Sequence, residues 1–322
     1  MAAPPSADGT TLRESLTVLA GLVILVLMTA LVGPYFVDWS AQRPAIEARL
    51  SAVLGQSVTI SGAVDIKLLP SPRLELHQVS VAGVAGQPGF SAEAVRLELA
   101  PMPLLRGELN FIEADFDQPR LLVTITREGD IRLPLAEGQL GPDTKFERIS
   151  LHRASIFVED VVSGRKLALD SLDLEADATS LNGPFKGNGQ VILAGEAVPF
   201  RFSTGVIEED KLRLRLALER AGALPQAEFD GFASLPAGPD GVRRPQFEGS
   251  ASLSGSLGAG GLPWHVSGPI VVDRTHAKSH ALEFRAGEEA AALSASGTGE
   301  WQFGASRSRG SPGLMWAAGP AR

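Results

Sequence analysis

The histidines are the residues of this chain whose chemistry could support a metal site or proton transfer. There are five of them: His77, His152, His265, His276 and His280. Only His276 and His280 are spaced four apart, which would bring both onto one face of a helix. They lie among strand signals, however, and lack the glutamate of a zinc-protease motif. We therefore interpret this segment as a solvated turn and expect no metal there.

Other short stretches resemble catalytic or binding signatures but are explained by turns. Residues 163–166 match S-x-x-K, a pattern so short that a hairpin turn accounts for it. The glycine-rich stretches 183–189 and 255–261 lack a following helix that could present amides to phosphate, so we interpret both as loops. The acidic groups at 159–160 and 208–210 are expected to be solvated turns and not Ca²⁺ sites. Because no acid, base and nucleophile converge, we expect no catalysis, no cofactor and no metal.

The composition excludes several classes of partner. The 322 residues carry 29 Lys and Arg against 37 Asp and Glu, a net charge of −8, and no basic tract. This balance argues against nucleic acid, and against docking on anionic lipid by charge alone. Cysteine is absent, so disulfides and thiolate sites are excluded. A hydrophobic content of 44% is enough for a folded core.

An uncharged apolar stretch near the beginning of the chain predicts a membrane anchor over residues 15–37. Its length suits a hydrocarbon core of about 30 Å and exceeds the apolar region of a signal peptide. Tyr35, Phe36 and Trp39 at its far end are typical of the membrane interface. A cleaved signal and a buried core helix are the alternatives. We expect the short tail of residues 1–14 to be cytoplasmic, although the flanking charges nearly cancel.

Residues 38–55 predict a short amphipathic helix. Ile46, Leu50, Val53 and Leu54 follow helical spacing, Ser40 could cap the first turn, and Gly55 suits a left-handed C-terminal cap.

Beyond the helix, residues 56–303 alternate between apolar and polar side chains with a period of two. The runs with this alternation begin at Val58, Val95, Leu121, Leu172, Val198, Leu212, Phe247 and Leu293. Gly, Pro, Asp and Asn separate them, which is typical of antiparallel strands joined by hairpin loops. The predicted fold is therefore mainly β: one long antiparallel sheet after two N-terminal helices.

A sheet with one apolar face must hide that face in a sandwich, in a closed barrel or in a curled groove. Only the groove leaves an apolar surface open to a guest, and the periodicity alone also fits an ordinary sandwich core. Glycines on the apolar side, such as Gly62, Gly249 and Gly297, indicate either curvature or bulges. The candidate lining residues are Val58, Ile60, Val64, Ile66, Leu68, Val95, Leu97, Leu99, Leu212, Leu214, Leu216 and Leu218. The sequence does not indicate which face curls inward.

The stretch VDWSAQRPAIEARLSAVLGQSVTISGAVDIKLLPSPRLEL from Val37 resembles the amino-terminal region of the AsmA family. Matching positions include Trp39, Pro44, Gly55 and Gly62. PLLRGEL at 103–109, QPRLLV at 118–123 and the turn at 128–130 continue the pattern. We expect the resemblance to extend to about Phe303, more weakly after Ile149.

The resemblance implies an inner-membrane anchor, with the N-terminus in the cytoplasm and a periplasmic β-groove whose interior is apolar. It further implies a non-catalytic role in phospholipid transport between the two membranes and in outer-membrane biogenesis. The partners would be phospholipid, the inner-membrane bilayer and envelope assembly proteins. The alternative is a structural scaffold that modulates outer-membrane protein assembly without binding lipid. An envelope enzyme is a third, disfavoured hypothesis.

Residues 304–322 depart from this pattern. They contain no Asp or Glu, do not alternate, and carry Arg307, Arg309 and Arg322. We interpret this irregular tail as off-register translation of a truncated or frameshifted gene, an expectation that sequencing of the locus tests.

Overall fold

In the computed structural model, many residues before position 39 and several loops are left undescribed. The structure describes residues 19–22, 24–25, 28–29, 31–33, 39–83, 88–104, 106, 110–127, 131–132, 145–161, 164, 166–178, 183–207, 211–236, 244–257, 261–273, 276–287, 292–302 and 317–318. Tyr35 and Phe36, the acidic group 208–210 and nearly all of the irregular tail lie outside these ranges. Within these ranges, no helix has the combined length and hydrophobicity that a membrane crossing needs.

The described chain is mainly β, as the alternation predicts. Residues 19–22, 24–25, 28–29 and 31–32 are helical. The helical segments η2 (Trp39–Gln42) and α2 (Arg43–Leu54) directly precede the strands, and a single helical turn, α3 (Pro101–Leu104), follows β4. The strands are β1 (Val58–Ile60), β2 (Val64–Lys67), β3 (Arg73–Ala82), β4 (Pro88–Leu99), β5 (Asn110–Asp117), β6 (Arg120–Ile125), β7 (Ile131–Arg132), β8 (Lys145–Asp160), β9 (Lys166–Ala178), β10 (Phe185–Leu193), β11 (Glu196–Thr204), β12 (Lys211–Leu218), β13 (Gln226–Ser234), β14 (Gln246–Leu257), β15 (Leu262–Val272), β16 (His276–Ala286), β17 (Leu293–Gln302) and β18 (Ala317–Ala318).

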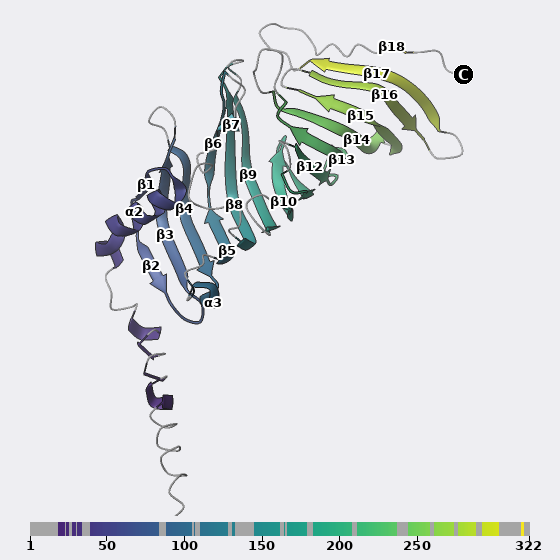
Figure 1. Ribbon diagram of the computed structural model, residues 1–322. Coiled ribbons are helices and arrows are strands. Elements are labelled where there is room, and N and C mark those ends of the chain that lie inside the picture. The colour runs from purple at the N-terminus through teal and green to yellow at the C-terminus, as the bar shows by residue number, and fades with distance from the viewer. Residues whose placement is uncertain are drawn as a thin grey trace, which may run out of the picture.

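All of these strands belong to one sheet of 18 described strands. The sheet is elongated, with α2 at one end and β17 at the other (Figure 1). From β8 to β17 each strand pairs antiparallel with the next strand along the chain. This succession of hairpins confirms the predicted antiparallel array.

At two positions in the sheet, two short strands lie end to end in place of one long strand. β1 and β2 both pair with β3, and the break between them falls at Ser61–Ala63, where the sequence predicted one continuous strand. β5 and β6 likewise lie end to end between β4 and β8, and both run parallel to β8. Their break contains Gln118, which has a positive φ of 48°, and Pro119. A proline cannot donate a ladder hydrogen bond, which explains an interruption at that point.

The predicted short helix is confirmed as α2, which begins at Arg43 and not at residue 38. Gly55 ends it with a left-handed φ of 68°, as expected. Ser40 is not its N-cap, because Ser40 lies within η2 and the helix begins after Gln42, which makes no side-chain capping bond. Trp39, Ile46, Leu50 and Leu54 pack against a buried cluster built by β1 to β4.

Side chains of α2 also accept hydrogen bonds from the backbone amides on the outer edge of β1. The Val58 amide donates to Ser51 Oγ at 2.9 Å, and the Ile60 amide donates to Glu47 Oε1 at 2.7 Å. Exposed strand edges are sites of aggregation because their amides and carbonyls are unpaired. The helix therefore closes this edge of the sheet as well as covering one of its faces.

We predict that Glu47→Ala destabilises the protein by about 1–2 kcal/mol, because it leaves the amide of the buried Ile60 without an acceptor. The measurement is thermal and denaturant unfolding of the full chain in detergent. Glu47→Gln keeps an acceptor oxygen and should lose less, whereas Arg49→Ala, at an exposed position of the same helix, should be nearly neutral. Equal losses for Glu47→Ala and Arg49→Ala would contradict this role.

Candidate functional site

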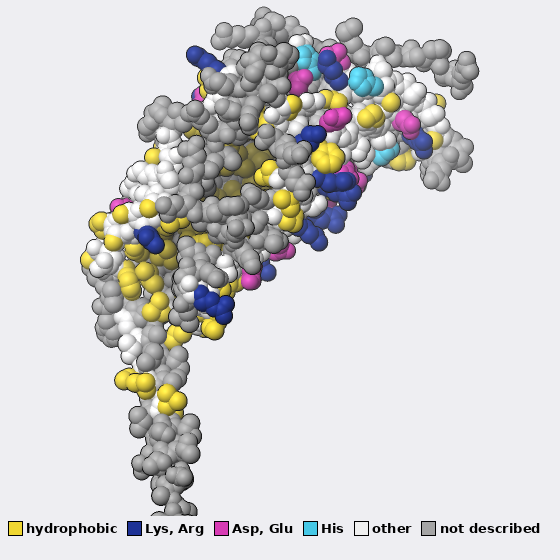
Figure 2. Space-filling view, viewed as in Figure 1, with side chains coloured by type: hydrophobic (Ala, Val, Ile, Leu, Met, Phe, Trp, Pro, Cys, Tyr) yellow, Lys and Arg dark blue, Asp and Glu magenta, His cyan; other side chains and the backbone are white. Residues whose placement is uncertain are grey.

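The apolar side chains of the strands lie on one continuous face of the sheet. On β12 and β13, Leu214 lies opposite Gly231 and Leu216 opposite Phe229. The same side continues through Phe200 and Phe202 on β11 and through Ala251 and Leu253 on β14. Figure 2 shows hydrophobic side chains gathered in the recess at the middle of the molecule, with Lys and Arg along the outer edge beside it.

The structure places nearly all of the candidate lining residues on this face. Val58, Ile60, Val64 and Ile66 lie beneath α2, so the helix covers the face at that end. Val95 and Leu97 lie opposite Leu76 and Leu74 on the neighbouring strand. Leu68 follows β2 and is 42% exposed, and Leu99 lies beyond a register shift. Leu212, Leu214, Leu216 and Leu218 are half-buried. Whether these side chains contact lipid stays a prediction.

The cover over the apolar face decreases along the sheet. A second buried cluster, built around Leu172, Val191, Val198 and Phe200, lies on β8 to β11. Farther on, large apolar side chains are open to solvent: Leu257 is 53% exposed, Leu262 47%, Leu293 74% and Trp301 51%. Monomeric soluble proteins rarely leave a continuous apolar surface open, so this part of the face is a candidate binding surface.

Glycines on the apolar face lie beneath aromatic rings of the neighbouring strand. A Cβ atom on Gly187 would lie 2.8 Å from the Phe202 ring, and one on Gly189 would lie 2.8 Å from Phe200. Gly255 has the same relation to Trp264, at 2.9 Å. The predicted loop at 183–189 is therefore wrong from Phe185 on, because Phe185–Leu193 forms β10 and its glycines make room for the rings. The predicted loop at 255–261 is likewise wrong at its start, because β14 extends to Leu257. In the sequence, the pattern G-x-G at 187–189 followed by F-x-F at 200–202 indicates this pairing of glycines with aromatic rings.

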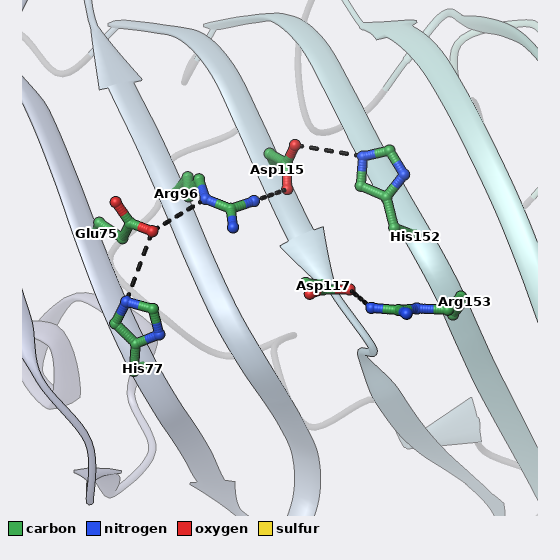
Figure 3. A network of polar contacts seen from close by, with 7 residues as sticks. All are labelled: Glu75, His77, Arg96, Asp115, Asp117, His152 and Arg153. Carbon is green, nitrogen blue, oxygen red and sulfur yellow. Dashed lines mark hydrogen bonds and ion pairs between the residues drawn. The ribbon is translucent and has the colours of Figure 1, made fainter.

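The opposite face carries charged side chains that alternate in sign from strand to strand. Figure 3 shows Glu75, Arg96 and Asp115 in a row across β3, β4 and β5. Arg96 Nε lies 3.1 Å from Glu75 Oε1, and Arg96 Nη1 lies 3.2 Å from Asp115 Oδ1. His77 and His152 flank the row, at 3.5 Å from Glu75 and 3.3 Å from Asp115. This row was not predicted from the sequence, although the alternating charges in RLELH, VRLEL and EADFD indicate it.

Two carboxylates of this face are held ionised by their partners. The Ser71 hydroxyl and the Arg73 guanidinium donate to Glu98 and lower its pKa below the usual value of 4.5. Arg153 donates to Asp117 at 2.6 Å and lowers the pKa of that carboxyl. Each partner is a neighbouring strand or loop residue, so these bonds also hold the strands in register.

Among the residues that the structure describes, no three metal-ligating side chains converge. His276 and His280 lie on strand β16, which corrects the predicted turn. A strand rises about 3.3 Å per residue, so two histidines four apart are roughly 13 Å apart along it and cannot share one ion. His276 instead lies 3.8 Å from Asp273. Of the acidic groups named above, Glu159 and Asp160 lie in β8, which corrects the predicted turn, and Glu159 Oε1 lies 3.1 Å from Lys166 Nζ.

A cavity of about 1130 Å³ lies on the charged face over β8 to β15. Its walls carry balanced charges, with Arg148, Lys186, Arg201 and Arg215 interleaved with Glu175, Asp177, Glu228 and Asp230. Arg215 Nε lies 2.7 Å from Asp230 Oδ2, so part of that charge is already paired. This arrangement favours no ligand of one sign.

Comparison with known proteins supports the family resemblance. Residues 11–136 match the sequence model of the AsmA family, a range that contains the predicted anchor segment, α2 and the strands up to β7. All of the quoted motifs lie inside this range, so the predicted resemblance is confirmed there, and its expected extension to Phe303 stays a prediction. No match was found among curated proteins or among solved structures.

We predict that Glu98→Gln lowers stability at neutral pH by about 1 kcal/mol and weakens its acid dependence. A carboxyl whose folded pKa is depressed contributes stability above its unfolded pKa and loses it as the pH falls through the folded value. The wild type should therefore lose stability as the pH drops below 4.5, and the variant should lose less. Unfolding midpoints between pH 3 and pH 7 measure this. Glu93→Gln, an exposed carboxylate of the same strand, is the control; parallel pH profiles for wild type and Glu98→Gln would contradict the assignment.

Proposed function

We propose that this chain is a membrane-anchored envelope protein of the AsmA type that assists phospholipid transport, because residues 11–136 match the sequence model of that family. Membership of this family indicates an envelope-related role. The proposal adds that residues 15–37 anchor the chain in the inner membrane, that the N-terminus is cytoplasmic, and that the β-sheet lies in the periplasm.

The observation that carries the proposal is the continuous apolar face. It runs through Phe200, Leu216, Phe229 and Ala251 without a charged side chain in those positions, and it becomes more exposed towards β17. Neighbouring strands are about 4.8 Å apart, so the nine strands β9 to β17 span roughly 38 Å. That length accommodates an acyl chain lying across several strands.

The energetics favour a passive role. Each methylene group transferred out of water contributes about 0.8 kcal/mol, so the barrier to free diffusion of a two-chain lipid is high. An apolar sheet face lowers that barrier, while the headgroup stays in solvent at the rim. No residue needs to act as an acid, a base or a nucleophile, and the proposed activity is therefore non-catalytic. Other envelope assembly proteins would deliver and accept the lipid.

We predict that the full chain, extracted from a bacterial envelope, retains phospholipid in native mass spectrometry and in lipid extracts. Leu214→Arg places a charge on the apolar face and should reduce the bound lipid at least tenfold. Ala217→Arg adds the same charge to the opposite face of the same strand and should leave it unchanged.

Because Leu214→Arg could unfold the sheet, Leu293→Arg provides a second variant at a position that is 74% exposed. Circular dichroism and thermal melts establish that each variant is folded. A folded wild type without lipid, or equal lipid retention in wild type, Leu214→Arg and Leu293→Arg, would overturn the proposal and favour the scaffold alternative.

A further inference from the structure

A second cavity, of about 650 Å³, differs in charge from the large one described above. It lies at the ends of β14, β15 and β16, beside the connection from β12 to β13. Its polar walls include Arg220, Arg285, His265, Gln226 and Ser254. Among the described residues, no carboxylate lines it, although the chain as a whole has a net charge of −8.

Four of these side chains form a row across the sheet. Gln226 lies opposite Ser254, Ser254 opposite His265, and His265 opposite Arg285. Residues opposite one another in neighbouring strands point to the same side, so each of four strands presents one polar group to the cavity. Ser, Gln and Arg side chains supply hydrogen-bond donors, and Arg supplies positive charge.

One guanidinium group, that of Arg285, ends this row, and the other, that of Arg220, lies beside β14. Arg220 Nη2 donates to Ser256 on β14, and Arg285 extends from β16. Two strand spacings separate β14 from β16, or roughly 9.6 Å, and β15 lies between them. That separation leaves room for a compact anion above His265, within reach of two flexible arginine side chains. Arginine binds phosphate through parallel hydrogen bonds from its planar fork.

The nearby carboxylates leave the arginine side chains of this cavity available to an anion. Glu283 lies 3.6 Å from Arg285, and both side chains are about two-thirds exposed, at 64% and 66%. Exposed pairs of this kind contribute little, and a phosphate dianion can compete for the guanidinium. Glu228 Oε1 accepts a hydrogen bond from Gln226 Nε2 at 3.1 Å, and Glu228 lies two residues farther along β13 from the strand end. The binding should therefore be moderate and sensitive to salt.

Apolar side chains at the same strand ends suggest what carries the anion. Leu257 and Leu262 pair across the turn between β14 and β15, and Leu293 begins β17 next to Ala286. All three are about half exposed or more, and Trp264 of the apolar face lines the cavity itself. The polar row itself points to the charged face of the sheet, so the cavity and these apolar side chains meet around the ends of the strands.

We propose that this cavity binds a phosphate group and that its source is the headgroup of a phospholipid whose acyl chains lie on the adjoining apolar face. The phosphate site stands on the cavity alone, whereas its assignment to a lipid rests on the proposed function. Free phosphate shares the same chemistry, and the experiment separates the two sources.

The test uses the full chain in detergent and three probes: phosphatidylglycerol, diacylglycerol with identical acyl chains, and inorganic phosphate. Native mass spectrometry measures retention of the two lipids, and phosphorus NMR measures phosphate binding. We expect the wild type to prefer phosphatidylglycerol, and Arg220→Gln with Arg285→Gln to reduce that preference at least tenfold. Arg148→Gln with Lys186→Gln removes the same charge from the large cavity and should change it less than twofold.

The outcomes separate the two proposals. Equal retention of both lipids by the wild type, or equal losses in the two double variants, would overturn the phosphate site while the apolar groove stands. Phosphate binding that depends on Arg220 and Arg285, without retention of either lipid, would support the anion site and overturn both its lipid source and the proposed function. A double variant that melts at a lower temperature is replaced by the single variant Arg285→Gln, whose side chain is 66% exposed.

Discussion

A single β-sheet has two faces and two edges, and the architecture of this protein follows from which side chains lie on each face and what covers each face and edge. The period-two alternation places apolar side chains on one face over nearly the whole length of the sheet. The helix α2 lies over this face at β1 to β4, and Ala221 and Leu224 pack against the second buried cluster on β8 to β11. Burial is therefore high at Ile60 and Val198 and low at Leu257 and Leu293, which determines where the protein can accept a guest.

The opposite face keeps the strands in register. A shift of one residue would bring charged side chains such as Arg96 and Arg215 to the apolar face and separate them from Glu75 and Asp230. Individually these partly exposed ion pairs contribute little to stability. Collectively they make every alternative register unfavourable, so the apolar face can stay continuous without tight packing against another layer.

Much of this could be predicted from the sequence, because alternation reports directly on which side chains share a face. The leucines of β12, the helix ending at Gly55 and the family resemblance were all readable from the order of residues. The breaks at Ser61–Ala63 and at Gln118–Pro119 were not predicted, since alternation continues on either side of each break.

The predicted loop at 183–189 failed for a different physical reason. Glycine usually marks a turn, but Gly187 and Gly189 lie in a strand because Phe202 and Phe200 occupy the space above them. The cavity lined by Arg220 and Arg285 also lay beyond sequence reasoning, because its members come from separate strands and meet only through the register of the sheet.

The succession of neighbouring hairpins from β8 to β17 has a consequence for how the chain folds. Each of these strands finds its partner next to it in the sequence, so this half has low contact order and can grow one strand at a time as the chain is synthesised. The parallel pairing of β5 and β6 with β8 is different, because it closes a longer loop before any contact compensates the lost entropy. Docking of β8 is therefore the expected slow step, the one that joins the helix-covered half to the growing meander.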